Sequence, residues 1–545
     1  MPHHTEVYAG PRVLQTERSP VGGHPLRRLV MPSPKPVPLE KRGRFTVNLI
    51  ANLGQLGLSM LVGVWYVPYL VRHLGQAAYG LIPLTSVLTS YMGLVTVGLN
   101  SPLARFLIIE LERDDHQRAN KVFNAAFWAN LALSGLLFIP AIIGITKTEW
   151  LARIPPGYET ATRWLFAGTA AAFLLNQIKT PFAVSAFCRN RLELQNLATV
   201  AETLTRVGLI LLLFSLATAR IEYVGAAILA GTLVSMAIVI YQWRVLTPTL
   251  HLTIRQFDWK MLKAISATGG WATISQLGGM LYLNIDLVLA NRLFGAEAGG
   301  QYAAVLQLPY LLTSLSLAVG GIFPPTTYQL YARGDIGALV SYLKRSIRFL
   351  GLVMAVPIGL ICGFSEPLLR LWLGPSFGRF APLLGLLTIY MCLTVAMYPL
   401  YAVPMAANRV KGQGLVTLAV GVGNLVLALF LAGPVGWGLY GLAAAGAISM
   451  TVRYVLFIPM YAAHILKQPI VTFLRSTLLI SLTTGAVIVM ARLILTRWPI
   501  TDWLELALAG GSVSIVVSAA VYACLTPDER LGLKETLRLS RYASR

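Results

Sequence analysis

The sequence predicts an all-α, polytopic membrane protein with about fourteen transmembrane helices. They would form two six-helix lobes related by a pseudo-twofold repeat, with two extra C-terminal helices. Hydrophobic residues make up 56% of the 545-residue chain and charged residues only 12%, about half the charged fraction of a soluble domain. Apolar runs near the ~20 residues that cross ~30 Å of hydrocarbon recur from about residue 45 onward. A polar motif also occurs twice, which indicates a duplication.

The apolar runs place each expected element in turn. Predicted spans cover 45–71, 80–104, 122–145, 164–187, 196–218, 223–243, 264–291, 301–327, 349–369, 381–406, 413–432, 438–463, 474–494 and 503–525. The first lobe is predicted at 45–243, the second at 264–463 and the extra helices at 474–525. Residues 1–44, rich in Pro, Gly and Arg, and residues 526–545 are predicted as basic cytoplasmic tails, the first of them disordered.

The net charge of +22 follows membrane topology rather than nucleic-acid binding. With a cytoplasmic N-terminus, about 31 of the 44 Lys and Arg residues fall in cytoplasmic segments, which agrees with the positive-inside rule. We therefore expect a multi-pass protein of the cytoplasmic (inner) membrane with both termini cytoplasmic. Anionic membrane lipids are expected to contact the basic loops, and no nucleic-acid partner is expected.

The repeated motif reads "NRLELQNLATVA" from Asn190 and "NRVKGQGLVTLA" from Asn408. Chance matches of Leu and Ala are common in apolar helices, but Asn-Arg-x3-Gln is not an apolar pattern. Pro181 and Pro399 are separated by the same offset as the two asparagines. Six helices per half would insert both halves in the same orientation, as parallel repeats. Such bundles can form an alternating-access cavity or an inert scaffold.

Four short motifs resemble those of bacterial polysaccharide and O-antigen flippases, which belong to the multidrug/oligosaccharidyl-lipid/polysaccharide exporter superfamily. The motifs are "WYVPYLVRHLGQAAYGLIPL" (65–84), "GLNSPLARFLIIELERDDHQRANKVFNAAF" (98–127), "YLNIDLVLANRLFGAEAGGQY" (282–302) and "SEPLLRLWLG" (365–374). Their order and spacing match over about 45–470. The resemblance implies two six-helix lobes around a central cavity, and transport of lipid-linked oligosaccharide across the cytoplasmic membrane.

Motifs of enzymes are missing from the sequence. It has no G-x-x-x-x-G-K-[ST] loop for ATP and no H-E-x-x-H or clustered His/Cys metal spacing. Its four cysteines lack C-x-x-C spacing, so they are interpreted as small apolar residues. We therefore expect no catalytic residues, no metal site, no cofactor and no enzymatic activity.

Three cations within predicted spans are candidate cavity residues. At ~1.5 Å per helical residue, Lys179, Arg206 and Arg453 each lie ~15 Å from the cytoplasmic ends of their spans. Charges at such depth are costly and normally face protein or water. An interior with more cations than carboxylates favours an anionic cargo such as a pyrophosphate-linked lipid, because guanidinium binds phosphate oxygens bidentately.

Two acids are comparably embedded. Glu202 lies one helical turn before Arg206, so it either forms an internal ion pair with that residue or takes part in gating. Asp286 lies nearer the outer end of its span, shortly before Arg292. It is interpreted either as a gate or structural ion pair, or as a carboxylate that couples transport to protons or sodium.

Other functions compete with the flippase interpretation. A multidrug exporter of the same superfamily, driven by cations, would be expected to embed more carboxylates and aromatic faces. An O-antigen polymerase or ligase would be expected to carry a large external loop, whereas the longest predicted one, about 146–163, is short. A non-transporting membrane component of glycan synthesis is a further alternative. Glycan polymerases and glycosyltransferases are candidate partners of the protein.

Overall fold

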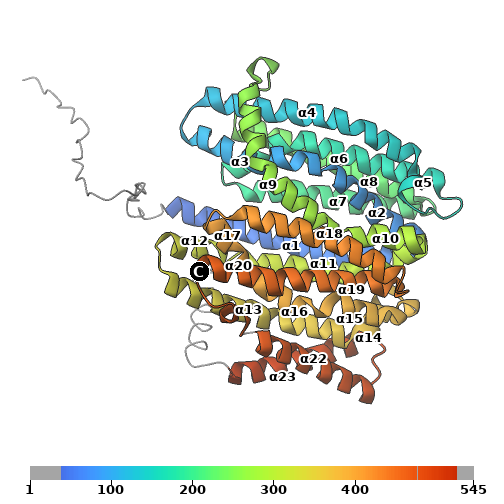
Figure 1. Ribbon diagram of the computed structural model, residues 1–545. Coiled ribbons are helices and arrows are strands. Elements are labelled where there is room, and N and C mark those ends of the chain that lie inside the picture. The colour runs from blue at the N-terminus through green and yellow to red at the C-terminus, as the bar shows by residue number, and fades with distance from the viewer. Residues whose placement is uncertain (1–38, 476, 525–545) are drawn as a thin grey trace, which may run out of the picture. The chain divides into compact units, whose positions relative to one another are not determined.

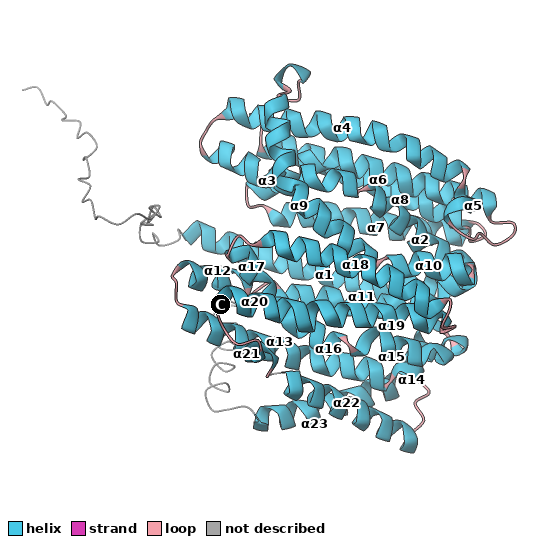
Figure 2. Ribbon diagram, in the orientation of Figure 1, coloured by secondary structure: helices cyan, strands magenta, loops and turns pink. Residues whose placement is uncertain are grey.

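The computed structural model describes residues 39–475 and 477–524, which are predominantly helical, with no β-strand among them (Figure 2). Nearly all of them belong to one compact unit that begins at Arg44. Helix α1 begins at Leu39, earlier than the predicted residue 45. The rest of the predicted N-terminal tail and the predicted C-terminal tail from residue 526 lie outside the described residues.

Helices of the first half follow the predicted order. They are α1 (Leu39–Leu74), α2 (Gln76–Met92), α3 (Leu94–Glu112), α4 (His116–Thr146), α5 (Thr148–Leu151), α6 (Glu159–Cys188), α7 (Leu192–Leu216) and α8 (Ile221–Leu246). Only Gly93 separates α2 from α3, so together they cover the second predicted span. Figure 1 shows α4, α6, α7 and α8 lying together.

The second half is more interrupted. After η1 (Ile254–Gln256) come α9 (Trp259–Leu283), α10 (Ile285–Phe294), α11 (Ala296–Gly320), α12 (Pro324–Ala332), α13 (Ile336–Gly363), α14 (Ser365–Leu373), η2 (Pro375–Phe380), α15 (Ala381–Ile389), α16 (Met391–Thr394), η3 (Val395–Tyr401), α17 (Ala402–Ala406), α18 (Val410–Ala432), α19 (Gly438–Thr451), η4 (Val452–Phe457) and α20 (Ile458–Leu466). The C-terminal helices are α21 (Val471–Leu474), α22 (Thr477–Arg497) and α23 (Trp503–Cys524). Prolines within several of these spans remove backbone hydrogen bonds and explain part of this fragmentation.

Within the described residues, twelve helical segments are long and apolar enough to cross a membrane. A thirteenth is a pair, Gly269–Leu283 and Ile285–Phe294, bent by 41° at Asn284. Helix α6 covers the remaining predicted span and is 30 residues long, but polar residues such as Gln177 and Lys179 interrupt its apolar sequence. The chain is thus an all-α, polytopic membrane protein, close to the predicted fourteen spans.

Three pairs of turns have a positive φ angle at matching places in the two halves. The angles are 82° at Gly75 and 95° at Gly295, 54° at Asp114 and 73° at Gly334, and 53° at both Asn190 and Asn408. The first two pairs share one offset, and the third has the slightly shorter offset of the repeated motif. Glycine, asparagine and aspartate adopt positive φ most readily. These offsets define equivalent positions in 45–243 and 264–463, which we propose to be the two lobes.

The repeated Asn-Arg motif marks the end of a helix. The N–H of Arg191 donates to Ala186 O, and that of Arg409 donates to Pro404 O, both at 2.8 Å. Such a bond across a left-handed residue is the Schellman arrangement that terminates helices. The Asn-Arg motif therefore occurs twice because it ends a helix in each half. From α1, Asn48 Nδ2 donates to Asn190 O at 3.1 Å, which ties the first helix to this turn.

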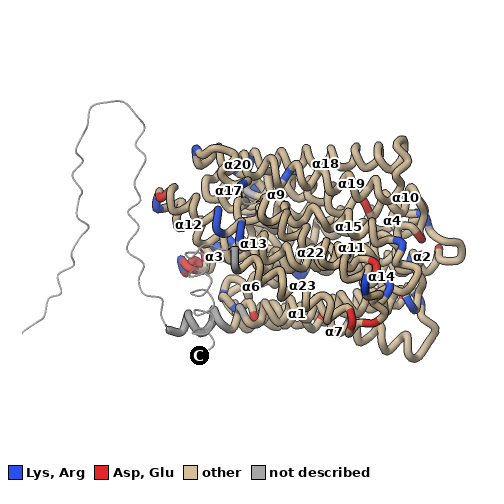
Figure 3. Tube along the Cα trace, turned by 90° about the horizontal axis from the view of Figure 1, so that it is seen from below, with Lys and Arg blue, Asp and Glu red and all other residues tan. Residues whose placement is uncertain are grey.

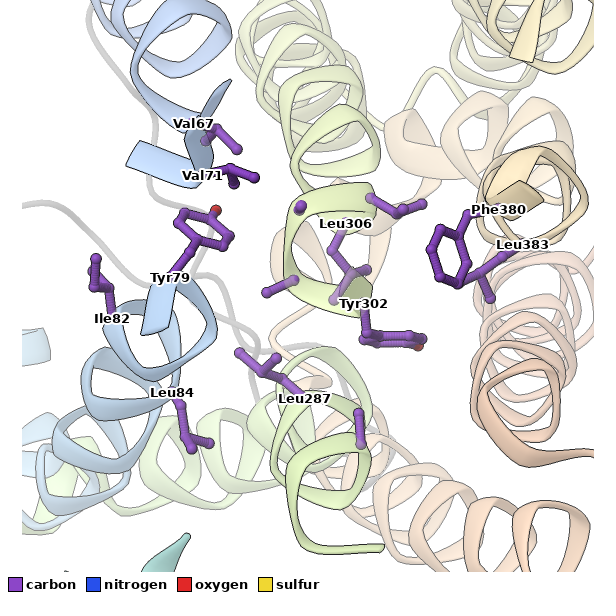
Figure 4. Close-up of a cluster of buried hydrophobic side chains, with 14 of the residues drawn as sticks. Val67, Val71, Tyr79, Ile82, Leu84, Leu287, Tyr302, Leu306, Phe380 and Leu383 are labelled. Atoms are coloured by element: carbon purple, nitrogen blue, oxygen red, sulfur yellow. The ribbon is translucent and has the colours of Figure 1, made fainter. Parts of the chain in front are cut away.

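The two halves meet backbone against backbone at glycines. A Cβ atom added to Gly80 in α2 would lie 2.5 Å from Gly300 Cα in α11. A Cβ added to Gly269 in α9 would lie 1.8 Å from Gly98 O in α3. Around the first contact, Figure 4 shows apolar side chains of α1 and α2 facing those of α10 and α11, among them Tyr79 and Leu287. Small residues thus permit the close helix approach that packing in membranes requires.

Two asparagines of α4 bind the segment that connects the halves. Asn120 Nδ2 donates to Thr249 O at 2.8 Å and its Oδ1 accepts from His251 N at 2.7 Å. One turn later, Asn124 Nδ2 donates to His251 O, and its Oδ1 accepts from Thr253 N, both at 2.8 Å. Both asparagines are buried. The connection is therefore anchored to the first half up to Thr253.

Beyond this anchor, Asp258 caps α9. Its carboxylate accepts hydrogen bonds from Lys260 N at 2.8 Å and Met261 N at 3.2 Å, and it lies 3.6 Å from Lys121 Nζ of α4. The Met261 and Lys260 N–H groups and Lys121 hold the pKa of Asp258 below its ordinary value. The first turn of α9 is thus also tied to α4.

Candidate substrate site

Lys179 and Glu202 form an ion pair between α6 and α7. Lys179 Nζ lies 3.2 Å from Glu202 Oε2 and donates to Ser235 Oγ of α8 at 3.0 Å. Thr232 Oγ1, also in α8, donates to Glu202 Oε1 at 3.4 Å. The side chains of the pair are 13% and 31% exposed. Glu202 is thus bound to Lys179, and the alternative that it pairs with Arg206 is wrong for this structure.

Arg206 has no carboxylate partner among the described residues. Its guanidinium carbon lies 5.7 Å from the centre of the Tyr66 ring of α1, in a cation–π arrangement. Its Nε is buried and has no hydrogen-bond partner in the part of the chain that the structure describes. A guanidinium has five N–H donors, so Arg206 keeps donor capacity that the surrounding protein does not use.

Arg453 lies in a cage of hydroxyl groups inside the second half. It donates to Tyr454 Oη at 2.9 Å, Thr417 Oγ1 at 3.0 Å and Tyr401 Oη at 3.2 Å, and also to Tyr282 Oη. Its guanidinium carbon lies 4.7 Å from the Tyr454 ring centre and 4.9 Å from that of Tyr282. The residue is 2% exposed and sits in η4, a π-helical turn, an irregularity frequent at functional sites. Neutral hydroxyls and ring faces therefore hold this cation.

Asp286 lies in the first turn of α10, directly after the bend at Asn284. It is 7% exposed, and Asn424 Nδ2 of α18 donates to its Oδ1 at 3.3 Å. Oδ2 approaches Gly446 of α19, where an added Cβ would lie 3.2 Å away. Asn424 Oδ1 is buried without a partner among the described residues. Asp286 forms no ion pair with another described residue, and Arg292 donates to Glu149 O of the first half.

Two of these contacts occupy equivalent positions of the two halves. Tyr66 and Asp286 have the same offset as the turns at Gly75 and Gly295, and Arg206 and Asn424 have the offset of the repeated motif. The contact between α1 and α7 therefore has its counterpart between α10 and α18. The first half places a cation there, and the second half places a carboxylate.

The structure brings some predicted residues together and separates others. Lys179 and Glu202 are in contact and Arg206 is one turn away, whereas Arg453 and Asp286 belong to separate clusters of the second half. Figure 3 shows most other charged positions towards the ends of the helices. The described residues contain no group of three or more His, Cys, Asp or Glu that could hold a metal ion.

Sequence reasoning missed the partners of these charges. Apart from Tyr454, which directly follows Arg453, the hydroxyl groups around Lys179 and Arg453 come from other elements and carry no pattern of their own. Asn424 is different, because the offset of the repeated motif, applied to Arg206, leads to it directly.

A cavity of about 500 Å³ lies elsewhere, at the predicted outer ends of α1 and α2. Its lining includes Arg72, Gln76, Tyr158 and Glu297 and none of the five predicted site residues.

Comparison with known proteins identifies the family. Residues 45–326 match the model of the family described as "Polysaccharide biosynthesis protein". The chain is 32% identical over 495 residues to "Uncharacterized membrane protein EpsK" of Bacillus subtilis (strain 168), covering 90% of this chain and 98% of the relative. This chain belongs to the polysaccharide biosynthesis protein family. A Shigella flexneri relative whose name proposes an O-antigen transporter is 23% identical over 420 residues, covering 75% of this chain and 94% of the relative.

Solved structures show the fold of this family member. The lipid II flippase MurJ in an inward closed conformation aligns with a TM-score of 0.61 at 14% identity, covering 87% of this chain and 98% of MurJ. A multidrug resistance MATE family transporter in its outward-facing conformation aligns with a TM-score of 0.54 at 15% identity, covering 81% and 95%. The all-α polytopic fold predicted from the sequence is therefore confirmed, as is its resemblance to polysaccharide flippases.

Proposed function

We propose that this protein moves an anionic lipid-linked oligosaccharide across the cytoplasmic membrane by alternating access between its two lobes. The observation that carries the proposal is Arg206, a guanidinium inside the membrane-spanning region with a buried Nε that no described group accepts. A cation held without a carboxylate is suited to bind an incoming anion. A phosphate or pyrophosphate group offers oxygens at the spacing that guanidinium binds bidentately.

The surroundings of Arg206 support this role. The Arg206 guanidinium lies over the ring of Tyr66, and its buried Nε has no acceptor among the described residues. Glu202, the nearest acid along α7, is already bound to Lys179. An arriving anion therefore does not have to displace a carboxylate from Arg206.

Lys179 and Arg453 enter the proposal as further cargo contacts. Glu202 holds Lys179, so a phosphate would have to compete with that carboxylate. Neutral hydroxyls hold Arg453, and the described residues give it no carboxylate partner. We propose that both cations meet the cargo only when the lobes have rearranged.

Asp286 is the proposed coupling residue. It is buried, and the Asn424 amide donates to it through Nδ2. The oxygen of the same amide, Asn424 Oδ1, has no partner among the described residues. A proton or a sodium ion would neutralise the carboxylate, and that amide oxygen could also accept the ion. Uptake of the ion at Asp286 would favour one arrangement of α10 against α18 and so drive the cycle.

The test measures surface glycan in cells whose only copy of the protein carries Arg206→Ala or Arg206→Lys, with protein level checked in the membrane fraction. We expect Arg206→Ala to abolish export and Arg206→Lys to retain part of it, because lysine keeps the charge without bidentate geometry. Arg220→Ala is the matched control, since Arg220 is exposed and pairs with Glu222 outside the predicted site. Normal glycan in Arg206→Ala cells at normal expression would overturn the proposal.

A second arm separates the alternatives. If Arg206→Ala cells lose drug resistance while glycan export is unchanged, the protein is the multidrug exporter. Loss of glycan polymerisation while lipid-linked units still reach the outer leaflet would indicate a non-transporting component of glycan synthesis. For coupling, Asp286→Asn is expected to abolish export and its dependence on the sodium or proton gradient. Wild-type export with that variant would remove Asp286 from the mechanism.

A further inference from the structure

Four hydrogen bonds join the two halves at their predicted outer ends. Asn291 Oδ1 of α10 accepts from Arg153 N at 2.8 Å, and Asn291 Nδ2 donates to Arg153 O at 3.2 Å. Arg153 Nη1 donates to Leu293 O at 3.3 Å, and Arg292 Nη1 donates to Glu149 O at 3.2 Å. We name this set, Glu149, Arg153, Asn291, Arg292 and Leu293, the outer clasp.

Asn291 binds the backbone of Arg153 rather than its side chain. The Asn291 amide hydrogen-bonds both the N–H and the C=O of Arg153, in the way that a paired β-strand hydrogen-bonds both groups of a residue. Asn291 is 2% exposed. Gly299 of α11 packs closely against it, since a Cβ added there would lie 3.1 Å from Asn291 Cβ. The central residue of the clasp is therefore buried and is bound through both atoms of its amide.

The position of the clasp gives it a consequence for transport. It joins α5 and the segment that follows it in the first half to the end of α10 in the second half. The contact of Gly80 with Gly300 lies near the same outer ends, early in α2 and in α11. The cavity at these helix ends is lined by Tyr158 from the first half and Glu297 from the second. Release of cargo on the outer side would require these junctions to separate.

We propose that the outer clasp is the outer gate of the transport cycle, and that Asn291 keeps it closed by binding the backbone of Arg153. This inference rests on the proposed function for its role in transport. The outer clasp, however, closes the protein in the absence of cargo, so its closing action can be tested without cargo. Hydrogen bonds at a rim can be exchanged for bonds to water when the lobes part, so the clasp can open without losing its polar partners.

The experiment uses a reporter cysteine under the gate. Ala304 of α11 is 0% exposed and lies one helical turn below Gly300, on the same helix face. Ala304→Cys is introduced into the full chain with Cys188, Cys362, Cys392 and Cys524 changed to Ser. A membrane-impermeant maleimide is added to spheroplasts, and the labelling rate is normalised to labelling after denaturation.

Two variants weaken the backbone contact, and one control spares it. Asn291→Leu removes both bonds that the amide makes, whereas Arg153→Pro removes the N–H that donates to Asn291 Oδ1 together with the side-chain bond to Leu293. Arg153→Ala keeps that N–H and loses only the side-chain bond to Leu293. We expect the first two to raise the labelling rate about tenfold, the effect of losing two hydrogen bonds of ordinary strength, and the control to stay within about twofold.

The outcomes decide the proposal without using cargo. If Asn291→Leu does not accumulate in the membrane, Arg153→Pro carries the test because it leaves α10 unchanged. Unchanged labelling with Arg153→Pro would overturn the gate, and so would equal labelling with Arg153→Pro and Arg153→Ala. Glycan export by the same cells reports separately on the proposed function, so failure of either proposal is distinguishable from failure of the other.

Discussion

Gly80 and Gly300 pack against each other although they lie in different halves, and their offset along the chain is the one that relates the turns at Gly75 and Gly295. A Cβ added to Gly300 would lie 1.8 Å from Gln76 O. Residues that a pseudo-twofold axis relates can touch each other only close to that axis. The contact of Gly80 with Gly300 therefore marks the expected position of the axis of the proposed repeat. Both glycines therefore serve the same purpose, which is to let α2 and α11 approach closely.

The first prediction follows from this contact. Gly300→Ala should lower the stability of the protein in detergent by about 1–3 kcal/mol, because the clash is with backbone that cannot move aside cheaply. Gly270→Ala is the control, since a Cβ there meets nothing within 4 Å. It should be neutral or slightly stabilising, as expected for alanine in a helix. Equal melting temperatures for the two variants would contradict the close approach.

The ion pair between Lys179 and Glu202 makes a second prediction. Lys179→Met should destabilise the protein on the order of 1–3 kcal/mol, because it leaves a partly buried carboxylate without its partner. Adding Glu202→Gln should restore much of that loss. A double-mutant cycle on thermal unfolding measures the coupling. Additive effects would show that the pair contributes no mutual stabilisation.

Arg453 makes a third prediction, which distinguishes arginine from lysine. Arg453→Lys keeps the charge, but a single ammonium cannot reach four hydroxyl groups around a planar guanidinium. We expect a loss on the order of 1–3 kcal/mol in unfolding free energy, together with reduced glycan export. Arg475→Lys, at the exposed end of α21, is the control and should change neither. A fully active and stable Arg453→Lys would mean that the cage contributes charge alone.

The fourth prediction concerns topology. The distribution of Lys and Arg predicts that Pro434 faces outward and that Arg538 lies in the cytoplasm. Reporter fusions after these two residues should therefore report opposite sides of the membrane. Two reporters on the same side would contradict both the fourteen-span topology and the parallel orientation of the halves.

The sequence by itself determined the features that depend on local composition. Apolar runs predict where helices cross the membrane because each run must satisfy its own backbone hydrogen bonds in lipid. The repeated Asn-Arg motif was recognisable because a left-handed helix end favours particular residues at particular places, as at Asn190 and Asn408. The family resemblance likewise rested on short, ordered motifs.

Only the tertiary structure decided which charge meets which partner. Helical spacing offered Glu202 as a partner for Arg206, yet Glu202 contacts Lys179 on another helix, because packing of α6, α7 and α8 brings their polar groups together. The cage of Arg453 and the hold of Asn291 on Arg153 likewise join residues from distant parts of the chain. Such contacts depend on how helices cross and rotate, and that is set by the packing of whole helix faces rather than by any single stretch of sequence.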